Sequence, residues 1–280
     1  MRFVPAPQLA ALTTFDACVS TADASMRSRY DNIRPHIAPT EHDFDQAVRS
    51  STLHQFSPSG AVGKDEMKCL YEDWMVGADG PGRDVYNQLI VSAPSNLCLL
   101  CGFGFVGHLD HHLPKSRYPA LAVTPLNLVP VCRDCNTFKG QRFPQSADKQ
   151  MLHPYYDNAT AERWLQARVT VTAYGPLVEF TAEPPAFYAP ALAAKVRHHF
   201  NVLKLALRFS TQASSELTCR RSTFLKIHQS VGATGLQDYL NSEAQDRAIA
   251  APNSWQTATY FALTKSDWFC DAGVSKIPGP

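Results

Sequence analysis

Apolar residues recur at helical spacing along the first third of the chain. They follow this spacing from residue 15 to about 37 and again over 41–53, with polar residues between them. The segment 57–64 is rich in turn-forming residues, and the acidic residues after it are typical of a helix start. Glycines and a proline then precede a short helical pattern over 85–94. The pattern predicts a mainly helical N-terminal region over residues 1–90.

The last part of the chain combines an alternating pattern with helical ones. Apolar and polar residues alternate over 169–173, stop at Gly175 and Pro176, and alternate again over 178–182, which predicts a β-hairpin. Residues 189–209 place an apolar residue at every third or fourth position, which predicts one helix with a core-facing stripe. Further helical stretches follow over 223–231 and 255–263. Residues 146–280 are therefore expected to form a hairpin with a helical C-terminal region.

Composition and charge narrow this picture only slightly. With 280 residues, 45% of them hydrophobic and 18% charged, the chain resembles an ordinary globular protein that can bury a substantial core. A formal net charge of +1 means that any nucleic-acid partner must be met by a local basic patch. Pro5 and Pro7 interrupt the apolar run at the N-terminus, so we expect neither a secretory signal nor a membrane span.

Half of the eight cysteines fall into two tight pairs in the middle of the chain. Cys98 and Cys101 form one C-x-x-C pair, and Cys132 and Cys135 form the other. Two such pairs can supply the four thiolates of a tetrahedral zinc site, and four protein ligands leave no position for water or substrate. We therefore predict a structural zinc ion and a reducing, cytoplasmic compartment. Four cysteines stand alone and are expected to be buried small hydrophobic residues: Cys18, Cys69, Cys219 and Cys270.

The residues between the two pairs suggest more than a scaffold. The simplest interpretation of the cysteines is a zinc ribbon that only supports the fold or binds a partner. Such a ribbon has no need for Asp110, His111 and His112 in a row, for Asn127, or for the segment CNTFKG that begins at Cys135. These oxygen- and nitrogen-bearing side chains point to a second metal centre.

The segment from Cys98 to Gly140 resembles the HNH endonuclease family. The matching text is CLLCG, LDHHLPKS and NLVPVCRDCNTFKG, which covers about a sixth of the chain. The resemblance implies an α+β fold in which residues 91–145 form a small ββα-metal core with a four-cysteine zinc site. This core would lie between the helical region 1–90 and the hairpin-containing region 146–280.

The resemblance also implies a role for each matching residue. His111 becomes the general base that activates water, and Asp110 a ligand of a catalytic divalent ion. Asn127 resembles the asparagine that braces the loop and so orients the histidine. Asn136 takes the place of the third motif residue and looks like the other metal ligand, although many members have histidine there. Two oxygen ligands favour Mg²⁺ or Mn²⁺ over a softer transition metal.

Two adjacent histidines, His111 and His112, compete for the role of base. Neighbours on a strand point to opposite faces, so His111 and His112 cannot both face the same ion. The family register Asp-His-x-x-Pro, filled by Asp110, His111 and Pro114, selects His111. We expect His112 to serve packing or hydrogen bonding, and His108 to be structural.

Two groups of basic residues are candidates for phosphate contacts. Lys115 and Lys139 are the first choices within the motif, where five cations face two acids between Cys98 and Arg142. In the C-terminal region, Arg197, Lys204 and Arg208 are expected to share one helical face, which either extends a nucleic-acid groove or only solubilises the surface. The full groups are Lys115, Arg117, Arg133, Lys139 and Arg142, and Lys195, Arg197, Lys204, Arg208, Arg220, Arg221 and Lys226.

These features predict a metal-dependent endonuclease that hydrolyses phosphodiester bonds in DNA, with RNA left open as a substrate. The alternative is a non-catalytic zinc-knuckle module that binds nucleic acid or protein. The helical additions also resemble nuclease effectors of bacterial antiphage defence, which often act with an ATPase. The sequence leaves strandedness, sequence preference and oligomeric state open.

Overall fold

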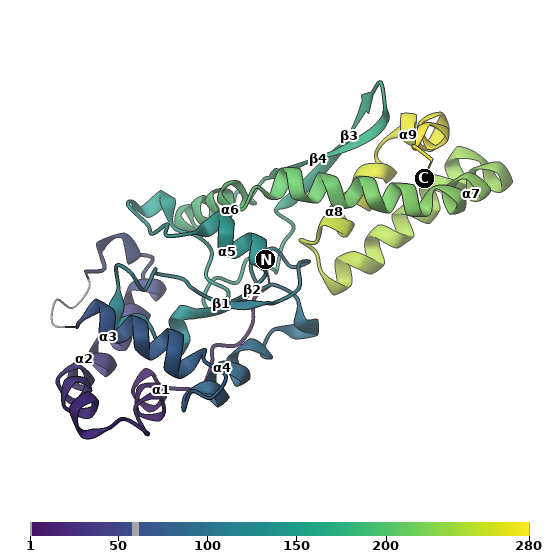
Figure 1. Cartoon of the computed structure of the whole chain (residues 1–280). Helices are drawn as coiled ribbons and strands as arrows, with labels where there is room; N and C mark the ends of the chain where they lie inside the picture. The colour runs from purple at the N-terminus through teal and green to yellow at the C-terminus, as the bar shows by residue number, and fades with distance from the viewer. Residues whose placement is uncertain (1, 58–61, 280) are drawn as a thin grey trace. The chain divides into compact units, whose positions relative to one another are not determined.

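A computed structural model describes residues 2–57 and 62–279, so most of the turn predicted over 57–64 lies outside the described residues. Figure 1 shows the chain, which forms two compact units, residues 1–158 and 159–280. The described chain is α+β, as expected, with helices around two separate two-stranded antiparallel sheets. The finer division into three regions stays a prediction, because compactness does not test where a functional region begins.

The first unit begins with two helices, α1 (Ala11–Cys18) and α2 (Ala24–Arg49). The side chain of Asp23 caps α2 by accepting a hydrogen bond from the backbone N–H of Met26. The two predicted helical patterns therefore do not match the two helices. The pattern over 15–37 is interrupted between α1 and α2, and its second part continues through Pro35 and Pro39 into the pattern over 41–53 as one helix, α2. These prolines cost α2 two backbone hydrogen bonds, and its buried apolar face offsets that loss.

Helix α2 contributes to two hydrophobic clusters of the first unit. Its N-terminal half packs through Ile33 and Ile37 with α1 and with the segment 67–75. Its C-terminal half packs through Phe44 and Val48 with the loop that follows the first strand. The remaining elements of this unit are α3 (Lys64–Cys69), the π-helix η2 (Leu70–Met75), α4 (Arg83–Ile90), β1 (His108–His111), β2 (Leu128–Val131) and α5 (Arg133–Lys139). Single 3-10 turns lie at Leu53–Gln55, Pro94–Asn96, Pro119–Leu121, Pro125–Asn127 and Ala147–Lys149.

The small sheet of the first unit is the framework of the candidate site. Strand β1 pairs antiparallel with β2, in a register that sets His108 opposite Val131 and His111 opposite Leu128. All four residues of β2 are buried. Helix α5 starts two residues after β2, so a strand, a strand and a helix follow one another, with a long loop between the strands.

The second unit contains the predicted hairpin. Strands β3 (Leu165–Thr172) and β4 (Gly175–Ala182) pair antiparallel along their whole length, so this prediction is confirmed. The chain turns at Gly175, whose φ of +108° favours glycine. Val178 and Phe180 of β4 are buried, Ala182 is half-buried, and Phe180 packs against Phe209.

Helices make up the rest of the second unit, and one predicted helix is wrong. The stripe over 189–209 divides into α6 (Pro190–Val202) and the start of α7 (Leu205–Ala250), because Lys204 adopts a φ of +51°. A second break inside α7 lies at Gly232, where φ is +72°, and Phe224 packs against Tyr239 from the other side of that break. The predicted helix 223–231 is therefore part of α7. The helix predicted over 255–263 is confirmed as α8 (Trp255–Thr264), followed by α9 (Asp267–Asp271) and a 3-10 turn at Gly273–Lys276.

Within the described ranges, no helix has both the length and the apolar character that crossing a bilayer requires.

Candidate functional site

The four paired cysteines meet in one cluster. Cys98, Cys101, Cys132 and Cys135 are all buried, and their sulfur atoms all lie within 4.8 Å of one another. The sulfurs of Cys101 and Cys132 are 3.8 Å apart. A tetrahedral zinc ion with bonds of about 2.3 Å would hold its sulfurs about 3.8 Å apart, so the cluster could hold a metal ion such as zinc.

Backbone groups of the two knuckles suit thiolates rather than thiols. The N–H of Gly104 points to the sulfur of Cys101 at 3.4 Å, and the N–H of Cys135 points to that of Cys132 at 3.5 Å. A Cβ atom at Gly104 would lie 2.8 Å from the sulfur of Cys132, so only glycine fits there. The knuckle turns at Gly102 with a φ of +80°. Four sulfurs are as many ligands as a tetrahedral zinc ion takes, so the cluster could fill the coordination sphere of such an ion.

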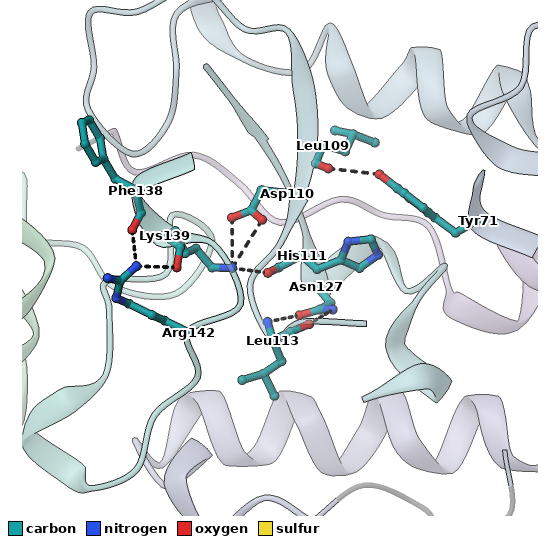
Figure 2. Close-up of polar contacts among 9 residues, drawn as sticks. All are labelled: Tyr71, Leu109, Asp110, His111, Leu113, Asn127, Phe138, Lys139 and Arg142. Atoms are coloured by element: carbon teal, nitrogen blue, oxygen red, sulfur yellow. Dashed lines mark hydrogen bonds and ion pairs between the residues drawn. The ribbon is translucent and has the colours of Figure 1, made fainter. Parts of the chain in front are cut away.

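Helix α5 links this cluster to the strand that carries the aspartate. Cys132 is the N-cap of α5, and its sulfur accepts from the N–H of Cys135 in the first turn. At the other end, Lys139 is only 2% exposed and reaches back to β1. Its ammonium group lies 3.2 and 3.3 Å from the two carboxylate oxygens of Asp110 and donates to the carbonyl of His111 at 2.6 Å (Figure 2).

Asp110 is buried together with this cation. The residue is 7% exposed, and burial raises the pKa of its carboxyl group, while the ammonium of Lys139 acts in the opposite direction. A second cation, Lys115, acts in the same direction as Lys139. Cations from two different segments therefore favour the ionised carboxylate, and Lys139 is the one that contacts it.

The imidazole of His111 is fixed in one orientation. Its Nε2 lies 2.8 Å from the carbonyl oxygen of Ala122. A carbonyl only accepts, so Nε2 carries the proton and Nδ1 is the nitrogen that can accept one. The ring packs edge-on against Tyr71, with 4.4 Å between centroids, and it points away from Lys139 in Figure 2. Burial lowers the pKa of His111 to about 3, so the ring is neutral at neutral pH.

Asn127 braces the loop between β1 and β2 from inside. It is fully buried, and its side-chain oxygen accepts from the N–H of Leu113 at 2.7 Å. Its amide nitrogen donates to the carbonyls of Leu113 at 3.0 Å and Leu121 at 3.2 Å. The backbone of Asn127 also accepts from the N–H of His112. These bonds fix both ends of the loop that carries Ala122, and therefore the carbonyl that orients His111.

The two other histidines near the site lie differently. His112 is buried, and its ring packs 4.2 Å from that of His153, away from the partners of His111. His108, expected to be structural, is exposed at the start of β1 and lines the cleft described next.

A cleft of about 670 Å³ opens onto β1 and α5. It brings together five of the sequence-predicted residues: Asp110, His111, Lys115, Asn136 and Lys139. Asn127 is not part of its lining, in keeping with its place behind the loop. The four cysteines are also outside the lining, so the cluster and the cleft are distinct sites.

One wall of the cleft comes from residues that the sequence did not single out. Helix α3 and the π-helix η2 contribute Lys64, Lys68, Tyr71 and Glu72. The hydroxyl of Tyr71 donates to the carbonyl of Leu109 in β1 at 3.0 Å, which ties this wall to the strand. The spacing of the lysines was visible in the sequence as one helical face, but nothing linked that face to residues some forty positions later.

The basic residues near the motif have mixed surroundings. Lys115 pairs with Glu72 at 3.3 Å, and Arg117 lies over the ring of Phe143 at 4.1 Å. Arg142 donates to the carbonyl of Lys139 at 3.1 Å, and Arg133 is exposed at the start of α5. Lys115 is partly exposed in the cleft, whereas Lys139 is enclosed.

The basic face predicted in the C-terminal region is wrong. The helix ends before Lys204, and Arg208 is 9% exposed, so Arg197, Lys204 and Arg208 do not form one continuous helical face. Other members of this group are bonded within the unit: Arg220 donates to Tyr239, and Arg221 to the carbonyl of Ile277. Lys195 is buried, and only Arg197, Lys204 and Lys226 of the seven are exposed.

Comparison with known proteins gives one informative result. No family model and no solved structure matches the chain. It is 32% identical over 224 residues to protein ea31 of Escherichia phage lambda, and the match covers 75% of each protein. A similarity of this extent shows common descent, so the chain belongs to the same family as protein ea31 of phage lambda.

Proposed function

We propose that this protein is a metal-dependent endonuclease of the HNH class that hydrolyses phosphodiester bonds in DNA. One observation carries the proposal: Asp110, His111 and Asn136 line one cleft, on a strand-strand-helix unit whose loop is braced by Asn127. A pattern read from the sequence alone would not require these side chains to share a cavity. Their convergence supports the catalytic interpretation over a plain zinc ribbon.

His111 is suited to take a proton from water. The bond from Nε2–H to the carbonyl of Ala122 leaves Nδ1 as the acceptor, and the low pKa of the ring keeps it unprotonated at neutral pH. A positioned general base of this kind contributes about 10²–10⁴-fold to a hydrolysis rate. Tyr71 holds the ring from one side, so the acceptor nitrogen keeps its direction.

Asp110 and Asn136 supply one carboxylate and one amide oxygen, a donor set that suits Mg²⁺ or Mn²⁺. A divalent ion bound there would neutralise charge on the scissile phosphate and on the leaving oxygen. Lys139 keeps the carboxylate of Asp110 in place between β1 and α5. Because its ammonium already pairs with both carboxylate oxygens, its position must adjust when an ion binds.

This same ion pair favours a second candidate function. A carboxylate that is neutralised by an internal lysine has less need of a metal ion, as expected of a non-catalytic module that binds nucleic acid or protein. The zinc cluster would then support a binding surface alone. The two candidates differ in one measurable property, the cleavage of a nucleic acid in the presence of a divalent ion.

The test is cleavage of supercoiled plasmid, linear duplex, single-stranded DNA and RNA, with Mg²⁺ or Mn²⁺ added. We expect DNA cleavage by the wild-type protein and a loss of at least about a hundredfold in His111→Ala, with zinc content unchanged and a cooperative unfolding transition retained. His42→Ala, which removes an exposed histidine outside the cleft, is the matched control and should cleave normally. Full activity of His111→Ala would remove the proposed base, and the absence of cleavage under every condition would favour the binding module.

Regulation by an ATPase partner in a defence system stays a prediction from the sequence. Purification from the native host would test it: a protein that is isolated alone and cleaves constitutively would contradict this role.

A further inference from the structure

Helix α3 forms one wall of the cleft and contributes exposed lysines to the lining that also contains the predicted catalytic residues. Lys64 and Lys68 are four residues apart, so they lie on the same face of the helix, and both line the cleft. Both are exposed. Lys115 joins them from the loop that follows β1. Two segments that are distant in sequence thus supply ammonium groups to one wall.

A carboxylate already lies between two of these ammonium groups. Glu72 of η2 is 3.9 Å from the ammonium of Lys68 and 3.3 Å from that of Lys115. The ammonium of Lys115 also lies 4.5 Å from the centre of the Tyr71 ring, which keeps it directed into the cleft. This arrangement shows that the wall can hold an anionic group between lysines from two elements.

The carboxylate of Glu72 is weakly held. The side chains of Lys68 and Glu72 are 57% and 45% exposed, and exposed pairs of this kind contribute little to stability. A phosphate oxygen can take the same position, because binding to DNA releases condensed counterions and so gains free energy that an internal ion pair does not. Glu72 would then have to turn outward, toward solvent.

We propose that Lys64, Lys68 and Lys115 bind the sugar-phosphate backbone of DNA beside the cleavage position, and that Glu72 competes with the phosphates for two of these lysines. This inference rests on the proposed function, whose DNA substrate it positions. It also gives the helical N-terminal region a role, because α3 and η2 form the wall against which the strand lies. The contacts are to phosphates and therefore add affinity without reading sequence.

The net charge of the lining agrees with this assignment. Among the cleft residues, four lysines stand against two acids, Asp110 and Glu72. Lys139 is committed to Asp110 inside the protein, which leaves three lysines and one carboxylate on the accessible wall. Without both Lys64 and Lys68, the accessible wall would carry one lysine and one carboxylate and would be neutral.

The binding experiment separates affinity from cleavage. A fluorescent duplex of about 20 base pairs is titrated by anisotropy at several salt concentrations, in a His111→Ala background and with wild-type protein without added divalent ions. We expect the double variant Lys64→Ala/Lys68→Ala to weaken binding by about tenfold or more near 0.1 M salt. Its slope of log affinity against log salt should fall by about two, one for each phosphate contact that is lost.

Two further variants make the assignment specific. Glu72→Gln should tighten binding by about threefold or more, because the competing charge is removed while the size of the side chain is kept. Lys149→Ala, an exposed lysine of the same unit outside the cleft, should change neither the affinity nor the slope. An unchanged slope in the double variant, or weaker binding in Glu72→Gln, would overturn the proposal.

The outcome also separates this inference from the proposed nuclease activity. If the wild-type protein cleaves no nucleic acid but the lysine variants lose affinity as predicted, the backbone site stands and the proposed enzyme falls. If cleavage occurs and the slope does not depend on the lysines, the enzyme stands and this site falls. Lysine dependence with an RNA duplex but not with DNA would overturn the assignment to DNA.

Discussion

The two candidate metal sites along α5 differ in almost every chemical respect. At its N-terminal end, four buried sulfurs lie within 4.8 Å of one another and could supply a tetrahedral donor set. Asn136 in the middle of the helix and Asp110 on β1 offer two oxygens beside an open cleft of about 670 Å³. A site that holds a fold needs all its ligands from the protein. A site that performs hydrolysis must leave positions for water and phosphate.

The contrast also shows how each site is stabilised before any ion binds. Thiolates in the first site receive backbone N–H groups, as from Gly104 and Cys135. The carboxylate of the second site forms an ion pair with the ammonium group of Lys139. The N–H groups at the sulfurs can stay in place when a metal ion binds, whereas the ammonium of Lys139 occupies the carboxylate that an ion would need. Removal of metal from the sulfur site should therefore destabilise the fold, whereas removal of metal from the oxygen site should abolish only the activity.

The largest expected effect comes from loss of the sulfur site. Cys135→Ser should lower the zinc content from one ion per chain to nearly none and abolish cooperative unfolding of the first unit, because structural zinc binding contributes about 10 kcal/mol or more. Metal analysis and urea unfolding measure both results. Cys219 was expected to be buried, but it is exposed in the second unit. Cys219→Ser is therefore the control and should retain zinc. A Cys135→Ser protein with full zinc and an unchanged midpoint would contradict the structural role.

The next effect concerns the brace between the two strands. Asn127→Ala leaves the N–H of Leu113 and the carbonyls of Leu113 and Leu121 without their partner, which should lower the free energy of unfolding by about 3 kcal/mol. Urea unfolding with zinc bound measures this. Asn87→Ala, at an exposed position, should cost less than about 0.5 kcal/mol. Equal stabilities of the two variants would mean that the loop does not depend on Asn127.

A smaller effect would sharpen the assignment of the oxygen site. Asn136 lies half-buried on α5, so Asn136→Ala should leave folding and zinc content intact. Loss of one ligand should raise the Mg²⁺ concentration needed for half-maximal cleavage by about tenfold or more, or about 1.4 kcal/mol. Thr137→Ala, the exposed neighbour on the same helix, is the control. An unchanged metal requirement would exclude Asn136 as a ligand.

The smallest effect is a pH dependence that belongs to the oxygen site. The pKa of His111 is lowered to about 3 in the folded protein, below its unfolded value near 6.5, so the unfolded state binds more protons between these values. The stabilisation is complete above about pH 6.5 and is lost as the pH falls, by up to about 1.4 kcal/mol per pH unit. Wild-type protein should lose stability between about pH 6 and pH 4.5 more steeply than His111→Leu. Parallel curves in urea unfolding would contradict the buried, neutral histidine.

Local patterns predicted the parts of the molecule that depend on neighbouring residues. The C-x-x-C spacing of the cysteines was enough to predict their cluster, because each pair forms one knuckle. The alternation around Gly175 was likewise enough to predict the hairpin β3–β4. The position of Asn127 directly before β2 was predicted from the family resemblance, whereas its three side-chain hydrogen bonds were not predicted.

Features that depend on contacts between segments distant in sequence could not be predicted from local patterns. Helix α2 continues through Pro35 and Pro39 because its buried face packs along two hydrophobic clusters. Lys204 breaks a stripe that the apolar spacing alone would continue. In the candidate site, the pairing of Lys139 with Asp110 and the wall that carries Lys68 come from contacts between separate segments.

The shortness of α5 couples these two chemically unlike sites. With seven residues, this helix is well below the length of about 12–15 residues at which an isolated helix becomes marginally stable in water. Its order therefore depends on its two anchors, the capping Cys132 at one end and the buried Lys139 at the other. If the sulfur end is released, helix–coil cooperativity should carry the disorder through both turns to Asn136 and Lys139. The structural ion would thus act as the nucleus of the helix that presents the oxygen ligand.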